Sequence, residues 1–126
     1  MADQFALTGT YTIQPIDGNL SLEPSVEAII DEALVFSRKI VATITLTVDT
    51  PVAVAFNGMT SAHVVILSTV GGKVTARFTS ADGSTQAIPV DSSLIIISRT
   101  VPFTAIDLTR VASTTTDVRV VLGQKA

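Results

Sequence analysis

The side chains best suited to chemistry in this chain are one histidine and eleven carboxylates, and there is no cysteine. His63 would be the base of any Ser-His-Asp arrangement, because the chain has no other histidine. It lies in the most apolar run of the chain, residues 62–69, where a histidine is usually hydrogen bonded in a core or an interface. No G-x-S-x-G turn is present to supply a nucleophilic serine. The sequence therefore indicates no catalytic role for His63.

The carboxylates do not form a recognisable reactive pair. Two acids held across a sugar could cleave a glycosidic bond, but four aspartates adjoin turn-forming residues, where carboxylates commonly accept local backbone hydrogen bonds: Asp17, Asp49, Asp82 and Asp91. The D-x-[DN]-x-[DN]-G calcium pattern is absent, and one histidine without cysteine is a poor basis for a transition-metal site. We expect no enzyme, no catalytic residue, no metal and no cofactor.

Length and composition predict one domain spanning residues 1–126 with a sizeable core, since 47% of the residues are hydrophobic. Aromatic residues are only 5% and tryptophan is absent, so Val, Ile, Leu and Ala must fill that core. The net charge of −3 provides no electrostatic reason to bind nucleic acid. No apolar run reaches the roughly 18 to 20 residues that span a bilayer. Because Met1 to Gln4 lead straight into alternating residues, we expect neither a signal peptide nor a membrane partner.

Three successive strands, 62–69, 73–79 and 84–90, are predicted to form an antiparallel meander at the centre of the fold. Turns at Gly71-Gly72 and Ala81-Asp82-Gly83 separate them, because glycine readily adopts the left-handed backbone that tight turns require. The first strand is apolar on both faces, which is typical of a buried central strand.

Alternating or continuous apolar patterns predict further strands over residues 5–14, 40–48, 52–56, 94–97, 106–109 and 118–122, with a short one at 20–22. Leu94 to Ile97 is apolar on both faces and is expected to be a second core strand. About eight to ten short strands indicate an all-β domain, a jelly roll or a related antiparallel β-sandwich. Residues 1–4 are expected to be extended and residues 124–126 frayed.

Residues 25–33 fit two periods equally well. Val26, Ile29 and Ile30 begin a helical spacing that continues to Leu34, so the fold could include one short helix at about 25–34. Leu34 also begins an alternation that continues through Ile40, so a long strand could start near residue 32. Both interpretations stay open for residues 25–33, and strand is favoured from Leu34 onward.

Four phrases in the last third of the chain carry a resemblance to a known group of proteins. They are TSADG from Thr79, IPVD from Ile88, VPFTAID from Val101 and VRVVLG from Val118. In this order they resemble small β-rich virion proteins of tailed bacteriophages. The resemblance implies a structural particle component that resides in the virion and is assembled in the cytoplasm of the host bacterium.

The role implied by the resemblance is that of a capsid decoration or cement protein, which oligomerises and bridges capsid subunits. A homo-oligomer is expected, with a trimer favoured, together with contacts to the major capsid protein or other virion proteins. The candidate interface consists of the N-terminal segment up to Phe5, an acidic face, and a loop near the C-terminal third: Phe5; Glu27, Asp31 and Glu32; Val101, Pro102 and Phe103.

Two other roles remain open. One is a small tail or head-to-tail virion protein. The other is a glycan-binding or receptor-binding β module, because jelly rolls commonly serve as lectins. Sugar platforms usually use exposed aromatic rings, however, and this chain has no tryptophan and a single tyrosine, Tyr11.

Overall fold

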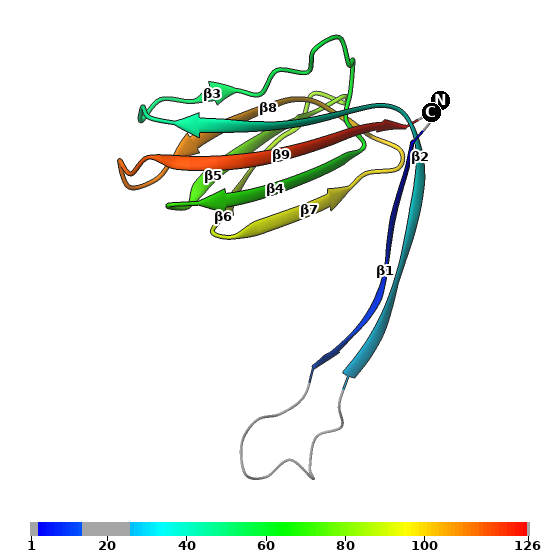
Figure 1. Cartoon of the computed structure of the whole chain (residues 1–126). Coiled ribbons are helices and arrows are strands. Elements are labelled where there is room, and N and C mark those ends of the chain that lie inside the picture. Colours follow the sequence, from blue (N-terminus) through cyan, green and yellow to red (C-terminus); the bar gives the residue numbers. More distant parts are fainter. Residues whose placement is uncertain (1–2, 14–25, 126) are drawn as a thin grey trace, which may run out of the picture.

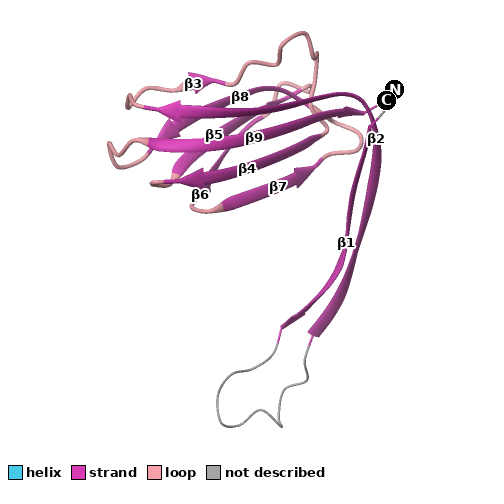
Figure 2. Cartoon of the chain, in the orientation of Figure 1, coloured by secondary structure: helices cyan, strands magenta, loops and turns pink. Residues whose placement is uncertain are grey.

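The computed structural model describes residues 3–13 and 26–125, with side chains from residue 36 onward. These residues form nine β-strands and no helix (Figures 1 and 2). The strands are β1 (Asp3–Ile13), β2 (Val26–Leu46), β3 (Val52–Ala53), β4 (Val64–Val70), β5 (Val74–Ser80), β6 (Thr85–Val90), β7 (Ser93–Ile97), β8 (Phe103–Arg110) and β9 (Thr116–Lys125). The all-β prediction is confirmed.

The strands form two antiparallel sheets that face each other. Sheet A has the order β1-β2-β9-β4-β7, and sheet B has the order β3-β8-β5-β6. Without β1, the two four-stranded layers have the strand order of a jelly roll, in which two Greek keys are rolled into a sandwich. The predicted jelly roll is therefore the observed architecture.

Alternation along each strand explains the core between the layers. Val118, Val120 and Leu122 of β9 face inward from sheet A, while Leu108 and Phe78 face them from sheet B, and all five are at most 1% exposed. Most of the core is aliphatic, as the composition predicted. Burial of this apolar surface supplies the main stabilisation of the sandwich.

The predicted meander is wrong at its first turn. β4 lies in sheet A between β9 and β7, whereas β5 lies in sheet B, so Gly71-Gly72 carries the chain across the sandwich. Gly71 has a φ of +100°, and a Cβ there would lie 2.7 Å from the Thr115 carbonyl oxygen. The second turn does close a hairpin, between β5 and β6. A tight turn can join strands within one sheet or between two, and local sequence does not distinguish the two cases.

β7 is not the second core strand that its apolar sequence predicted. It lies at the edge of sheet A and pairs only with β4. Leu94 and Ile96 pack against the core, but Ile95 is 48% exposed on the outer face. The inner face of β7 is therefore packed against the core, while its equally apolar outer face is not covered by another layer.

Of the two interpretations left open for residues 25–33, the strand is the one observed from Val26 onward, where β2 begins, and the short helix allowed at about 25–34 does not form over the described residues. The first half of β2 pairs with β1 over eleven residue pairs, and its second half pairs with β9 from Phe36 onward. Long-range pairing on both sides thus overrides the helical spacing. We call β1 together with residues 26–36 of β2 the arm; it extends away from the sandwich (Figure 1).

Several strand ends differ from the sequence prediction. β3 is only two residues long, and β9 continues to Lys125, where fraying was expected. Asp3 and Gln4 already belong to β1. The short strand predicted at residues 20–22 lies outside the described residues.

Candidate interface surfaces

The register of the arm divides its residues between two faces. Residues directly opposite each other in an antiparallel pair share a face. Over residues 5–13 and 26–34, one face, which we call the arm's apolar face, combines eight hydrophobic positions with one glycine and one glutamate: Phe5, Leu7, Gly9, Tyr11, Ile13, Val26, Ala28, Ile30, Glu32 and Leu34. The Asp3–Phe36 pair continues this face to the base of the arm. The other face has mainly polar positions. The arm is thus an amphipathic two-stranded ribbon.

The acidic face predicted from a helical reading does not form. Glu27 is opposite Thr12 and Asp31 is opposite Thr8, so both belong to the polar face of the arm. Glu32 is opposite Leu7 and belongs to the apolar face, because neighbouring strand residues alternate. Phe5 occupies that same face, opposite Leu34.

Phe36 fixes the place where the arm leaves the sandwich. Its side chain is 6% exposed and clusters with Val64, Ile66 and Ile97 on the outer face of sheet A. The ring covers Gly123, where a Cβ would lie 2.6 Å from Cε1 and from Cε2. The pairing shifts register between Phe36 and Arg38, as a β-bulge does. The absence of a side chain at Gly123 therefore determines how Phe36, and with it the arm base, sits on the sheet.

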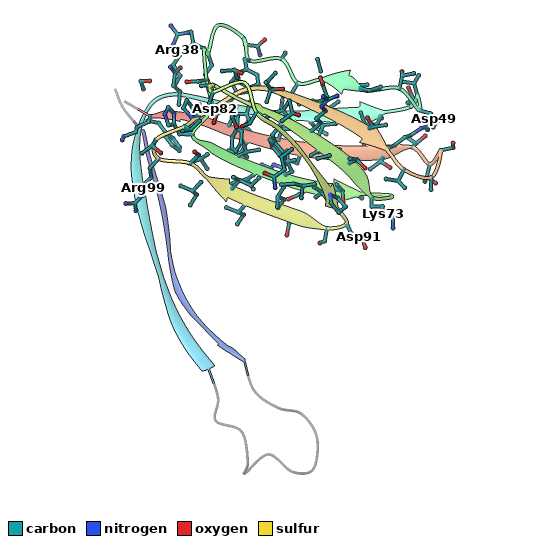
Figure 3. All side chains as sticks on the ribbon, turned by 180° about the vertical axis from the view of Figure 1, so that it is seen from behind. Arg38, Asp49, Lys73, Asp82, Asp91 and Arg99 are labelled. Carbon is teal, nitrogen blue, oxygen red and sulfur yellow. The ribbon has the colours of Figure 1, made fainter. Side chains whose placement is uncertain are left out.

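Arg38 holds the same junction from the other side. Its guanidinium donates a hydrogen bond of 3.0 Å to the carbonyl oxygen of Gly58, in the loop between β3 and β4. Figure 3 shows Arg38, Asp82 and Arg99 at the end of the sandwich from which the arm departs, with Asp49, Lys73 and Asp91 at the opposite end. Both ends of the sandwich thus carry charges of both signs.

A row of β-branched residues crosses the outer face of sheet A. Val41 pairs with Val121, Val121 with Ile66, and Ile66 with Ile95, so the four lie side by side on adjacent strands. Val41 is 55% exposed and Ile95 is 48% exposed. We call these four residues the apolar row. Ile66 and Val121, which lie between Val41 and Ile95, are half-buried. A contiguous apolar strip with exposed ends is typical of an interaction surface.

Cationic residues border the apolar row on both sides. Lys39 precedes Val41 by two residues on β2, and Arg119 precedes Val121 by two residues on β9, so each shares the outer face with its neighbour in the row. Both are exposed. The outer face of sheet A therefore combines apolar area with positive charge.

The loop predicted as an interface is attached to the sandwich through its backbone. The carbonyl oxygen of Pro102 accepts a hydrogen bond of 2.9 Å from the Ala81 amide, and Ser98 Oγ donates to the carbonyl oxygen of Val101. Val101 is 38% exposed. Phe103 belongs to the core, with its ring centroid 5.1 Å from that of Phe78, so its ring is not offered at the surface. The interface prediction is corrected for Phe103, because the start of β8 turns its side chain inward.

His63 forms a hydrogen bond that joins two strands of sheet A. Its Nδ1 accepts a hydrogen bond of 3.1 Å from the Lys125 amide, which requires the neutral ring. Burial, and then the positive charge of Lys125, lower the pKa of His63 from its usual 6.5. The histidine thus fastens the end of β9 to the start of β4.

Asp49 joins two loops at the sandwich end away from the arm. Its carboxylate accepts hydrogen bonds from Arg110 Nε at 2.8 Å and from Ser113 Oγ at 3.0 Å. These hydrogen bonds, the one from Ser113 first, lower the pKa of Asp49 below 3.8. The arrangement satisfies a loop carboxylate and presents no second acid for catalysis.

The described residues offer little to a small ligand. No pocket is found over them, and no three His, Cys, Asp or Glu side chains among them gather closely enough to hold a metal ion. In the same part of the chain, no helix is long and apolar enough to cross a membrane. The features that stand out are the arm and the apolar row.

The sequence carried a further signal that residue-by-residue reading missed. Six of the eleven acidic residues lie before residue 38, and all eight Lys and Arg residues lie from Arg38 onward. Residues 1–37 thus carry a net charge of −6 and residues 38–126 carry +3, which together make the total of −3. Counting charge by segment would have separated the arm from the sandwich. The apolar row was missed because Ile66 and Ile95 were interpreted as buried.

Comparison with known proteins identifies no relative by sequence. No family model matches the chain, and no curated protein matches it. A solved structure, FeII HppE, is similar to 88% of this chain at 10% identity and a TM-score of 0.39. The chain spans 55% of the length of that protein. A likeness this distant carries no functional argument.

Proposed function

We propose that this protein is a structural component of a bacteriophage particle, a capsid decoration or cement protein that oligomerises and bridges capsid subunits. The observation that carries the proposal is the arm. Among the described residues, β1 pairs only with β2, and the ribbon they form extends away from the sandwich. A subunit that must reach a neighbour needs a rigid body with such a projecting element.

The dimensions of the arm suit bridging. An eleven-residue strand such as β1 is about 35 Å long. A hairpin of this length reaches across much of an adjacent small domain. The sandwich supplies a fixed base for the arm. The Phe36 ring packs over Gly123 of β9, and Arg38 donates a hydrogen bond to Gly58 in the loop between β3 and β4.

The exposed apolar side chains support a protein partner rather than a glycan. From residue 36 to residue 125, the large exposed hydrophobic residues are all aliphatic: Val41, Val48, Val70, Ile95, Val101 and Val111. Sugar rings are usually bound on exposed aromatic rings, whereas aliphatic surface suits packing against another protein. The resemblance of residues 79–123 to phage virion proteins is in accord with this reading.

The proposal is tested by counting copies of the protein in purified particles of the phage that encodes it, by quantitative mass spectrometry against the major capsid subunit. On the order of hundreds of copies per particle, as symmetry-repeated lattice positions require, would support decoration of the head. Particles that lack the protein should then lose DNA at lower temperature than wild-type particles. A count matching one small ring would instead indicate a neck or tail protein, and absence from particles would overturn the virion assignment.

A further inference from the structure

We propose that the arm of one copy docks on the outer face of sheet A of a second copy, with the arm's apolar face against the apolar row. The inference deepens the proposed oligomeric role by naming the partner and both contact surfaces. The docking proposal rests on the proposed oligomerisation and not on the assignment to a phage.

The arm needs a partner for its apolar face. A two-stranded hairpin is at best marginally stable alone in water, and a third strand or a packed layer is needed to stabilise it. Within the described residues, β2 is the element with which β1 pairs, and that pairing satisfies the backbone without covering either face of the ribbon. The eight hydrophobic positions of the arm's apolar face therefore call for another surface.

The apolar row is a matching surface. It runs across four adjacent strands of sheet A, and no strand of sheet B covers the outer face. Face-to-face packing of two β layers requires apolar side chains on both, at a separation of about 10 Å. The arm's apolar face and the row meet this requirement.

Charge favours the same pairing. Residues 1–37 carry −6 and the remainder of the chain +3, so the arm of one copy is attracted to the sandwich of another. Lys39 and Arg119 border the apolar row, and Glu32 lies on the arm's apolar face, opposite Leu7. Glu27 and Asp31 lie on the arm's polar face, so they add to the negative charge of the arm without facing the row. Two arms, by contrast, repel each other, which disfavours arm-to-arm association.

The arm cannot reach the apolar row of its own chain. β2 runs without interruption from the arm into sheet A, and the arm points away from the sandwich (Figure 1). Folding it back would break β2 at the junction that Phe36 and Arg38 hold. The row is thus open to the arm of a second copy.

The two surfaces also suit a reciprocal pair. The Phe5–Leu34 face of the arm continues through the Asp3–Phe36 pair, and Phe36 lies on the outer face of sheet A, so arm and row share one side of one bent sheet. A twofold axis would place each arm on the other sheet, an isologous contact. The row has one residue on each of four strands, which lie about 4.8 Å apart, so a contact with it is roughly 20 by 10 Å. Two such contacts bury roughly 400 Å² per partner, about half of the roughly 800 Å² of a standard interface, and we therefore expect a concentration-dependent association.

The first test is the oligomeric state of the full chain by sedimentation velocity over a range of concentrations. A double variant, Val41→Glu with Ile95→Glu, places charge on the exposed ends of the row. Association should weaken at least about tenfold, because burying an uncompensated charge is costly. Val111→Glu makes the same change at a residue that is 49% exposed but lies in the β8–β9 loop, and it should leave association unchanged.

Cross-linking tests the two surfaces directly, since the native chain has no cysteine. A chain with Ala28→Cys, on the arm's apolar face, is mixed with one carrying Ile95→Cys, and a short bismaleimide should join the two. Thr10→Cys, on the polar face, is the matched control and should not react with Ile95→Cys. A dimer or a closed ring with this pattern supports the inference. A monomer at all concentrations, or association that the double variant leaves intact, overturns it without affecting the particle count.

Discussion

The arm and the sandwich consist of similar strands but differ in what stabilises them. The sandwich encloses sixteen buried hydrophobic residues between two sheets, whereas the described part of β1 pairs only with β2. The sandwich segment is cationic overall and the arm segment is acidic. The comparison teaches that strands of similar pattern can enclose a core between two sheets or form a ribbon whose described strands pair with each other.

The largest expected difference between the two regions is in their response to loss of an aromatic ring. Phe78→Ala removes a core side chain that is 1% exposed, and we expect a loss of about 3–5 kcal/mol in the free energy of unfolding. Tyr11→Ala in the arm should cost the dilute monomer less than about 1 kcal/mol. Urea unfolding at low concentration measures both. Equal losses would mean that the arm belongs to the same folding unit.

The junction between the regions should be sensitive to one added methyl group. Gly123→Ala forces the Phe36 ring away, and overpacking of this kind costs about 1–3 kcal/mol. In a double variant with Phe36→Leu, the smaller side chain should restore part of the loss. The free energy of unfolding of each variant is measured by thermal unfolding. If the losses of the two single variants simply add in the double variant, the contact between Phe36 and residue 123 does not determine stability.

Charge on the outer face of sheet A should affect association more than folding. Arg119→Glu replaces attraction to the acidic arm with repulsion, and about 0.2–1 kcal/mol per exposed pair corresponds to a loss of about 1.5- to 5-fold in affinity. The effect should diminish as salt is added. Arg77→Glu, exposed on sheet B, is the control. An equal effect of both variants would indicate a response to net charge rather than to the surface.

The Asp49 contact should stabilise the fold at neutral pH and lose its effect in acid. Because hydrogen bonds lower the pKa of Asp49 below 3.8, its contribution to stability is full above that value and is lost as pH falls through the folded pKa. Asp49→Asn should therefore shift the midpoint of acid unfolding to higher pH. Asp91→Asn, at the same end of the sandwich, should shift it less (Figure 3).

The smallest effect is expected from His63. Burial lowers its folded pKa, so the unfolded chain takes up a proton first as pH falls below 6.5. Stability should be full above pH 6.5 and decline as pH falls through the folded pKa. His63→Gln should flatten the dependence between pH 7 and 5, as measured by thermal unfolding. A slope equal to that of the unmodified chain would exclude His63 as its source.

Much of the fold was predictable because alternation of apolar and polar residues is local. The strand predicted at residues 40–48 and the hairpin around Asp82 and Gly83 follow from two-residue periodicity and turn chemistry. Pairing was not predictable, because Gly71-Gly72 could join strands of one sheet or of two. Residues 26–33 became strand through β1, a partner about twenty residues away.

The candidate interface was predicted less well than the fold. Glu27, Asp31 and Glu32 were predicted to share one acidic face, but they lie on β2, where alternation puts Glu32 on the opposite face from the other two. Phe103 was taken from a loop motif and lies in the core. Ile95 was expected to be buried, since a run that is apolar on both faces indicates two covered faces only when another layer is present. Whether a layer covers a face is a property of the whole fold.

The pairing of Phe36 with Lys125 has a consequence for how the chain folds as it is made. β9 lies between β2 and β4, so sheet A has no central strand until nearly the whole sequence is available. The β5–β6 hairpin needs only neighbouring residues, whereas closing β2 onto β9 requires a loop of at least about seventy residues, from Leu46 to Thr116. On the ribosome, the apolar row would therefore be completed only after β9, which contributes Val121, has been made.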